Sequence, residues 1–212
     1  MIFYLVRHAR SVANEAGLVT GTPLDTLAPE GAAQSLSMSQ WLKNAGFVAQ
    51  RHVTSHWLRA RQTASSLMPD MHWQIEPRVG ETDAGEVADW MLTRFVTETP
   101  DFYAAPTKRY PGGESHLELN YRVLSWFNDQ LQNPCEALML VSHSGPISCI
   151  LQHILGVPMK RFPAFLPAHA SLSAIEMVKR NGNWQGKILG FSICPVESLP
   201  QNMYGSYNRH PL

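Results

Sequence analysis

The stretch Phe3-Tyr4-Leu5-Val6-Arg7-His8-Ala9 is an apolar run that ends abruptly in an arginine and a histidine. Such a run is typical of a buried β-strand, and open α/β sheets bind ligands at the carboxyl ends of their strands. We therefore expect Arg7 and His8 where a small anionic substrate would bind. A guanidinium can pair with two phosphate oxygens, and a neutral imidazole can attack phosphorus.

A second apolar run has the same kind of ending. Residues 137–141 lead into Ser142-His143-Ser144-Gly145, and Pro146 is suited to the first turn of a helix. If the two strands are neighbours, His8 and His143 meet at one rim of the sheet. The helix N-terminus adds unpaired N–H groups and a partial positive charge, which together favour an anion.

The order of apolar patterns predicts the fold class. Strand-like runs alternate with amphipathic helices, which implies a three-layer α/β/α sandwich with a mostly parallel central sheet. Asn181-Gly182 is a strong hairpin signal and predicts an antiparallel edge strand. The predicted strands cover residues 2–6, 52–55, 73–75, 137–141, 172–178 and 184–193, and the predicted helices include residues 31–45, 60–67 and 89–97 and segments that begin near 115 and 146.

The length and composition predict one domain over residues 1–212, with an irregular lid or insert around 80–111 and a tail from 195. Formal net charge is zero and the pI is about 7.1, so no basic field favours nucleic acid or an anionic membrane surface. The absence of a leader pattern, of a membrane-spanning run and of paired cysteine motifs predicts a cytoplasmic protein. No H-E-x-x-H motif is present, and we expect neither a metal nor a cofactor.

Further motifs carry a resemblance to a known family. Arg7-His8-Ala9 matches an R-H-G motif, the segment 55–64 matches S-x-x-x-R-A-x-Q-T-A with Arg59 as a second phosphate arginine, and Glu81 with Gly85 matches E-x-x-x-G. Together with the P-G-G-E-S stretch at 111–115 and the second histidine motif, these residues resemble the histidine phosphatase superfamily, also called phosphoglycerate mutase-like. Within it, the chain is similar to the small phosphatases of the α-ribazole phosphatase type.

The resemblance implies a mechanism. His8 would become a phosphohistidine, while Arg7, Arg59 and His143 hold the equatorial oxygens of the phosphoryl group. Glu81 would protonate the leaving alcohol and then deprotonate the attacking water, without a metal. A solvated loop acid is the alternative for Glu81, because Asp83 and Glu86 lie nearby in the sequence. Substrate contacts are also expected from Ser11, Asn14, Thr20, Gly21 and Ser144, although Asn14, Thr20 and Gly21 equally fit a turn.

Three residues depart from the family pattern. Ala9 and Ser144 stand where glycine usually follows each histidine, and Arg10 replaces a common Glu or Gln. The two missing glycines motivate one alternative function, a phosphoryl-binding module with weakened turnover. Lys108 and Arg109 could bind a second substrate charge or simply be an exposed basic pair.

The preferred function is a metal-independent phosphatase that hydrolyses the phosphomonoester of a small metabolite. A phosphoglycerate-mutase-type phosphotransferase is the other alternative. The segment between Glu81 and Pro111 is shorter than in the mutases that the chain resembles, where it carries extra basic residues for a carboxylate. That segment should select the substrate, and its aromatic residues could be pocket wall or core: Trp90, Phe95, Phe102 and Tyr103. The sequence predicts neither the ester nor the oligomeric state.

Overall fold

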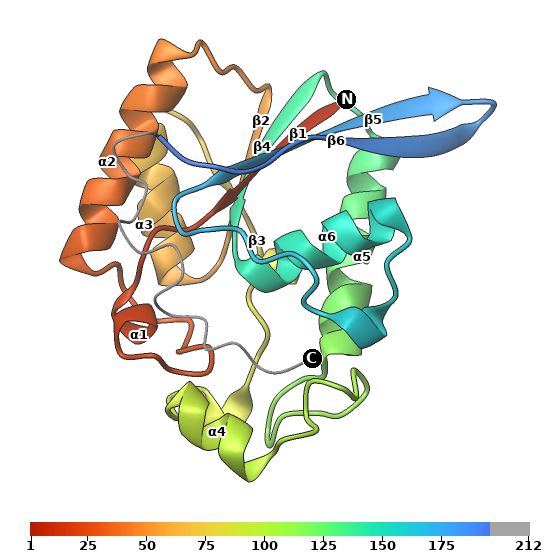
Figure 1. Cartoon of the computed structure of the whole chain (residues 1–212). Helices are drawn as coiled ribbons and strands as arrows, with labels where there is room; N and C mark the ends of the chain where they lie inside the picture. The colour runs from red at the N-terminus through yellow and green to blue at the C-terminus, as the bar shows by residue number, and fades with distance from the viewer. Residues whose placement is uncertain (196–212) are drawn as a thin grey trace.

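A computed structural model describes residues 1–195 and shows a six-stranded sheet between two layers of helices (Figure 1). The strand order is β3-β2-β4-β1-β5-β6, in which β3, β2, β4 and β1 run parallel to one another and β5 runs antiparallel to β1 and β6. The strands are β1 (Ile2–Arg7), β2 (Arg51–Ser55), β3 (Gln74–Glu76), β4 (Ala137–Ser142), β5 (Leu172–Arg180) and β6 (Asn183–Ile193). The expected three-layer sandwich with an antiparallel hairpin at one edge is confirmed.

The four longer helices cover opposite faces of the sheet. Helices α2 (Pro29–Asn44) and α3 (Leu58–Leu67) pack on one face, and α5 (His116–Gln132) and α6 (Ser144–Leu155) pack on the other (Figure 1). A capping box of Ser115 and Glu118 begins α5, at the place where a helix near 115 was expected. Among residues 1–195, none of the helices is both long and apolar enough to cross a bilayer.

The two central strands bring the candidate site together. Strands β1 and β4 are adjacent and parallel, with Arg7 paired to Ser142 in the register. All six residues of β4 are buried, because helices cover both of its faces. The expectation that His8 and His143 leave the sheet at the same rim is therefore confirmed.

The segment between β3 and α5 folds onto its own small core. It contains the 3-10 turns η1 (Pro77–Val79) and η2 (Gly85–Val87) and the helix α4 (Leu92–Glu98), and it lies beyond the end of the sheet (Figure 1). Phe95 and Phe102 are buried within this core rather than lining a pocket. A helix was predicted over 89–97, but α4 is shorter and begins only at Leu92. Residues 85–90 instead form the η2 turn and the bend that follows it.

A hairpin and a short helix lie toward the two ends of the described chain. The hairpin β5–β6 turns at Asn181 and Gly182, which both have positive φ as a two-residue hairpin turn requires. A short helix, α1 (Val12–Glu15), was not predicted, and Ser11 begins it with a capping box. The tail predicted from 195 lies outside the described residues except for Pro195 itself.

Candidate active site

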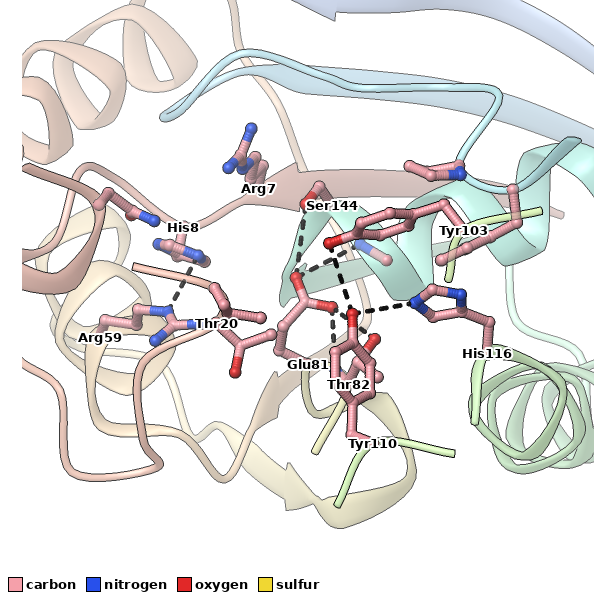
Figure 2. Close-up of a pocket in the computed structure, with 15 residues that line it drawn as sticks. Arg7, His8, Thr20, Arg59, Glu81, Thr82, Tyr103, Tyr110, His116 and Ser144 are labelled. Carbon is pink, nitrogen blue, oxygen red and sulfur yellow. Dashed lines mark hydrogen bonds between the residues drawn. The ribbon is translucent and has the colours of Figure 1, made fainter. Parts of the chain in front are cut away.

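A pocket of about 130 Å³ opens at the carboxyl ends of β1 and β4 (Figure 2). Two kinds of side chain line it. One side is charged and polar, and the other is mainly aromatic, with Glu81 between them (Figure 2). The lining residues are Arg7, His8, Asn14, Val19, Thr20, Arg59, Glu81, Thr82, Tyr103, Tyr110, His116, Ser144, Gly145, Phe162 and Pro163.

His8 follows strand β1 and has a fixed tautomer. Its Nδ1 lies 2.7 Å from the Ala9 carbonyl oxygen, which can only accept, so Nδ1 carries the proton and Nε2 keeps its lone pair. The Arg59 Nε–H donates to that Nε2 at 3.1 Å. Burial, then the positive charge of Arg59, holds the pKa of His8 well below its usual range. The ring is therefore neutral at pH 7, as a nitrogen nucleophile must be.

Arg59 lies in the first turn of α3 and is almost fully buried. Its Nη1 pairs with the Asp25 carboxylate at 3.0 Å, and its guanidinium lies 4.5 Å from the centre of the Trp57 ring. Burial lowers the pKa of Arg59, and the Glu81 and Asp25 carboxylates oppose that shift. A guanidinium nevertheless remains charged in proteins, so Arg59 is a fixed cation beside the His8 ring.

His143 is fully buried directly after β4, with its ring centre 4.8 Å from that of His8. Its Nε2 lies 2.8 Å from the Ser55 Oγ, and that oxygen already accepts the Trp57 backbone N–H. The Ser55 hydroxyl can donate to Nε2, and in that arrangement the proton of His143 is on Nδ1. Within residues 1–195 this Nδ1 has no hydrogen-bond partner. Burial, then the nearby arginines, lowers the pKa of His143, so the ring is neutral.

Arg7 ends β1 and is buried at the rim of the pocket. Its Nη1 donates to the Pro167 carbonyl oxygen at 2.6 Å, which fixes the side chain. Arg7 and Arg59 are the only Lys or Arg side chains among the described residues that line the pocket. Lys108 and Arg109 do not line it; Arg109 instead pairs with Glu118 at 2.9 Å.

Glu81 faces the N-terminus of helix α6. One carboxylate oxygen accepts the Thr82 backbone N–H at 2.9 Å, and the other lies 3.4 Å from both the Gly145 backbone nitrogen and the Ser144 hydroxyl. Arg122 donates to the Glu81 backbone carbonyl at 2.8 Å and so holds this turn in place. A side chain at this position can exchange a proton with a group bound between it and His8.

The rival acids are placed differently. Asp83 accepts the Gly85 backbone N–H at 2.9 Å, and both Asp83 and Glu86 lie outside the set of pocket-lining residues. Of the predicted substrate contacts, Asn14, Thr20 and Ser144 line the pocket. Ser11 and Gly21 do not line it: the Ser11 side chain caps α1, and Gly21 lies in the loop after α1 with a φ of 69°.

Several site residues were missed by sequence reasoning. Asp25 positions Arg59, and Tyr110, His116 and Phe162 form much of the aromatic wall. His169 packs against His8 with ring centres 5.6 Å apart. None of these residues follows a strand motif, so no local signal marked them. Among residues 1–195, no group of three or more His, Cys, Asp or Glu side chains is placed to hold a metal ion.

The fold and the paired histidines at one sheet rim define the class of protein. Residues 3–187 match the family model of the histidine phosphatase superfamily (branch 1), and the chain belongs to this superfamily. Arg7, His8, Arg59 and Glu81 line the pocket and His143 packs against His8, at the positions that carried the resemblance.

Particular relatives include both phosphatases and mutases by name. The chain is 29% identical over 197 residues to the adenosylcobalamin/alpha-ribazole phosphatase of Salmonella typhimurium, covering 84% of this chain and 91% of that protein. It is 27% identical over 190 residues to "Probable phosphoglycerate mutase GpmB" of Proteus mirabilis, covering 85% and 86%.

Solved structures with this fold include a mycobacterial glucosyl-3-phosphoglycerate phosphatase in complex with VO3, with a TM-score of 0.78, 19% identity, and coverage of 90% of this chain and 98% of that chain. The alpha-ribazole phosphatase from Shigella flexneri aligns with a TM-score of 0.75, 22% identity, and coverage of 90% and 96%. These structural similarities establish the fold. Relatives named as phosphatases and relatives named as probable mutases both belong to the superfamily, and this chain is an enzyme of the same superfamily.

Proposed function

We propose that the protein is a metal-independent phosphatase that hydrolyses a phosphomonoester through a phosphohistidine on His8. The observation that carries the proposal is the tautomer of His8. Its Nδ1 proton is committed to the Ala9 carbonyl at 2.7 Å, so the lone pair of Nε2 is left for phosphorus. Glu81 lines the same pocket and can act as the proton donor.

In the first step, His8 Nε2 forms a bond to phosphorus as the bond from phosphorus to the ester oxygen breaks. The leaving oxygen takes a proton from Glu81 and departs as the alcohol. Arg7, Arg59 and the Nδ1–H of His143 would stabilise the charge on the equatorial oxygens. Losing one such preorganised donor typically costs about 3–4 kcal/mol of transition-state stabilisation.

In the second step, a water molecule attacks the phosphohistidine. Glu81, now a carboxylate, takes a proton from that water, the bond between Nε2 and phosphorus breaks, and inorganic phosphate leaves. Arg59 donates to Nε2 in the absence of ligand, so its Nε–H must turn toward the phosphoryl oxygens when substrate binds. The Asp25 carboxylate keeps the guanidinium nearby during that exchange.

The two alternatives make different demands on the pocket. A phosphoglycerate mutase must bind the substrate carboxylate as well as the phosphoryl group. Among the described residues, the lining cations are Arg7 and Arg59, both on the side of His8 (Figure 2). A binding module without turnover has no need of a neutral imidazole nucleophile facing a carboxylic acid. The phosphatase is therefore favoured over both.

The test is hydrolysis of p-nitrophenyl phosphate in the presence of EDTA. The wild type should be active, and His8→Ala should lose at least about a thousandfold in kcat/KM, because a nucleophile has no substitute. His72→Ala, which removes an exposed histidine, is the matched control and should retain activity. Activity that survives in His8→Ala, or that requires a metal, would refute the proposal.

Binding of orthovanadate separates the remaining outcomes. If no ester is hydrolysed but orthovanadate binds, the binding module is favoured. Transfer of phosphate between the hydroxyl groups of phosphoglycerate would favour the mutase. A cytoplasmic location and a lack of nucleic-acid partners remain predictions from the sequence.

A further inference from the structure

The side of the pocket that faces the leaving group differs sharply from the side that faces the phosphoryl group. Tyr103, Tyr110, His116 and Phe162 form the aromatic wall, and Glu81 separates this wall from His8 (Figure 2). The aromatic wall is built from two distant parts of the chain, the segment 103–116 and the loop after α6. Its rings contact one another, with the centres of Tyr103 and His116 at 5.5 Å and those of His116 and Phe162 at 4.7 Å.

The polar groups in this wall form a chain of hydrogen bonds. The Tyr110 hydroxyl lies 3.3 Å from His116 Nε2 and 3.5 Å from the Tyr103 hydroxyl. A hydroxyl can donate and accept at once, so Tyr103 presents a group that can pair with an alcohol. The aromatic rings beside it provide apolar faces. Together these groups suit a substrate that carries both carbon–hydrogen faces and hydroxyls.

All three polar side chains in the wall are uncharged near pH 7. Burial raises the pKa of Tyr103 and of Tyr110 above their usual range, so both stay phenols. Burial lowers the pKa of His116 to about 4, so its ring is not a cation. The wall therefore offers no positive charge to an acidic leaving group.

The surrounding charges disfavour a second anion. Arg7 and Arg59 lie on the phosphoryl side, and Asp25 already pairs with Arg59 at 3.0 Å. The carboxyl group of Glu81 lies beside the aromatic wall in Figure 2, and its negative charge acts on Tyr103 and Tyr110. A substrate carboxylate placed against the aromatic wall would lose its hydration without pairing with a cation. Burying an unpaired charge in this way costs free energy.

We propose, building on the phosphatase activity proposed above, that the pocket selects phosphomonoesters of uncharged, hydroxyl-bearing alcohols and rejects alcohols that carry a carboxylate. The aromatic wall, defined by Tyr103, Tyr110, His116 and Phe162, is the determinant of this selection. The phosphoryl group is the single anionic group that the pocket accommodates.

The test compares two esters with the same three-carbon chain. Glycerol 3-phosphate and 3-phosphoglycerate differ in one end group, a hydroxymethyl in the first and a carboxylate in the second. The wild type should show a kcat/KM at least tenfold higher for glycerol 3-phosphate. Equal values, or a preference for 3-phosphoglycerate, would overturn the proposal.

Two substitutions at one position assign the effect to the aromatic wall. Tyr103→Phe removes the hydroxyl that would pair with a substrate hydroxyl. It should lower kcat/KM for glycerol 3-phosphate several-fold relative to kcat/KM for phenyl phosphate, whose leaving group has no second hydroxyl. Tyr103→Arg should shift the ratio for the two three-carbon esters at least tenfold toward the acid. Tyr121→Arg adds the same cation to an exposed position on α5 and should leave this ratio unchanged. Ratios measured within one protein do not depend on the folded fraction of a sample.

Failure of the phosphatase proposal is a separate outcome. It would appear as an absence of His8-dependent hydrolysis of phenyl phosphate. In that case the same two esters are compared as ligands of the His8→Ala protein by calorimetry. Tighter binding of glycerol 3-phosphate would support the selection, and equal or tighter binding of 3-phosphoglycerate would overturn it.

Discussion

Asp25 determines where the guanidinium of Arg59 can be. Its two oxygens accept from the Arg59 Nη1 and from the Ala13 backbone N–H, each at 3.0 Å, and its side chain is almost fully buried. The carboxylate therefore connects the loop after α1 to the first turn of α3. Arg59 in turn donates to Nε2 of His8, the nitrogen proposed as the nucleophile.

Asp25→Asn should lower kcat/KM for p-nitrophenyl phosphate by about tenfold to a hundredfold. The amide keeps the size of the side chain but loses the charge, and hydrogen bonds to charged groups contribute about 1.5–3 kcal/mol. The affinity for orthovanadate should fall in parallel, which a purely structural role would not produce. Glu30→Gln is the control, because Glu30 pairs with Arg10 at an exposed site. Unchanged activity in Asp25→Asn would show that Arg59 needs no such support.

Ala9 shows why a departure from the family pattern is tolerated. The residue is completely buried, and its backbone N–H donates to the Thr63 hydroxyl at 3.1 Å. The backbone contacts at this position are thus made without glycine. Ser144, the other departure, lines the pocket and bonds to Glu81 rather than blocking it.

At the scale of elements, the N-terminus of α6 and the turn at Glu81 fit closely together. A Cβ built on Gly145 would lie 2.3 Å from a Glu81 carboxylate oxygen and 3.2 Å from Leu119. The carboxylate is the end of a flexible side chain, so it can move away at little cost to folding. Glycine at position 145 is therefore needed to leave room for the Glu81 carboxylate, and not to allow the helix to form.

Gly145→Ala should accordingly displace Glu81 without unfolding the protein. We expect kcat/KM for an alkyl phosphate to fall at least tenfold more than for p-nitrophenyl phosphate, whose leaving group needs little protonation. Alanine is preferred over glycine in helices by about 1 kcal/mol, so the free energy of unfolding in urea should not decrease appreciably.

Ser144→Ala is the matched variant for Gly145→Ala, because it removes a hydrogen bond to Glu81 without adding bulk beside it. It should show the smaller loss of the two. Equal effects of Gly145→Ala on both kinds of ester would contradict the assignment of Glu81 as the proton donor.

At the scale of the whole molecule, several buried neutral histidines couple folding to pH. Burial lowers the pKa of His8, His143 and His169, and it lowers that of His116 to about 4. Between each lowered pKa and the ordinary value near 6.5, the unfolded chain binds protons that the folded protein does not. The free energy of unfolding must therefore fall as the pH drops below about 6.5.

The lowered pKa of His116 predicts how much the free energy of unfolding changes with pH. A pKa near 4 in the folded protein corresponds to about 2 kcal/mol of stability lost between pH 7 and pH 5 from this residue alone. His116→Gln should be less stable at pH 7 but should lose about 2 kcal/mol less than the wild type over that interval, as measured by urea unfolding. The same pH dependence in both proteins would mean that His116 is not held neutral by burial.

The sequence was sufficient to predict the sheet, its covering helices and the residues at the carboxyl ends of β1 and β4. It was not sufficient to predict the aromatic wall of the pocket. Strand β1, strand β4 and the helices after them follow strong apolar periodicity, and parallel neighbours place Arg7, His8 and His143 together. The positions of Tyr110, His116 and Phe162 depend on how the segment between β3 and α5 packs on the loop after α6. That packing joins residues far apart in the chain, and no local pattern reports it.

The short and irregular elements show the same limit. Helix α4 begins at Leu92 because a 3-10 turn precedes it, and the aromatic residues that could be wall or core were divided by tertiary packing. Phe95 and Phe102 became core, while Tyr103 reached the pocket. Periodicity alone could not separate these roles, because buried and pocket-lining rings have the same composition.

The central claim is that His8 becomes phosphorylated on Nε2 during turnover. The most direct measurement is rapid acid-free quenching during hydrolysis of a phosphomonoester, followed by mass spectrometry and 31P NMR of the denatured protein. The account predicts an acid-labile, alkali-stable phosphate on Nε2 of His8 that is absent in His8→Ala. A phosphate on another residue, on Nδ1, or turnover with no phosphoenzyme on the pathway would contradict it.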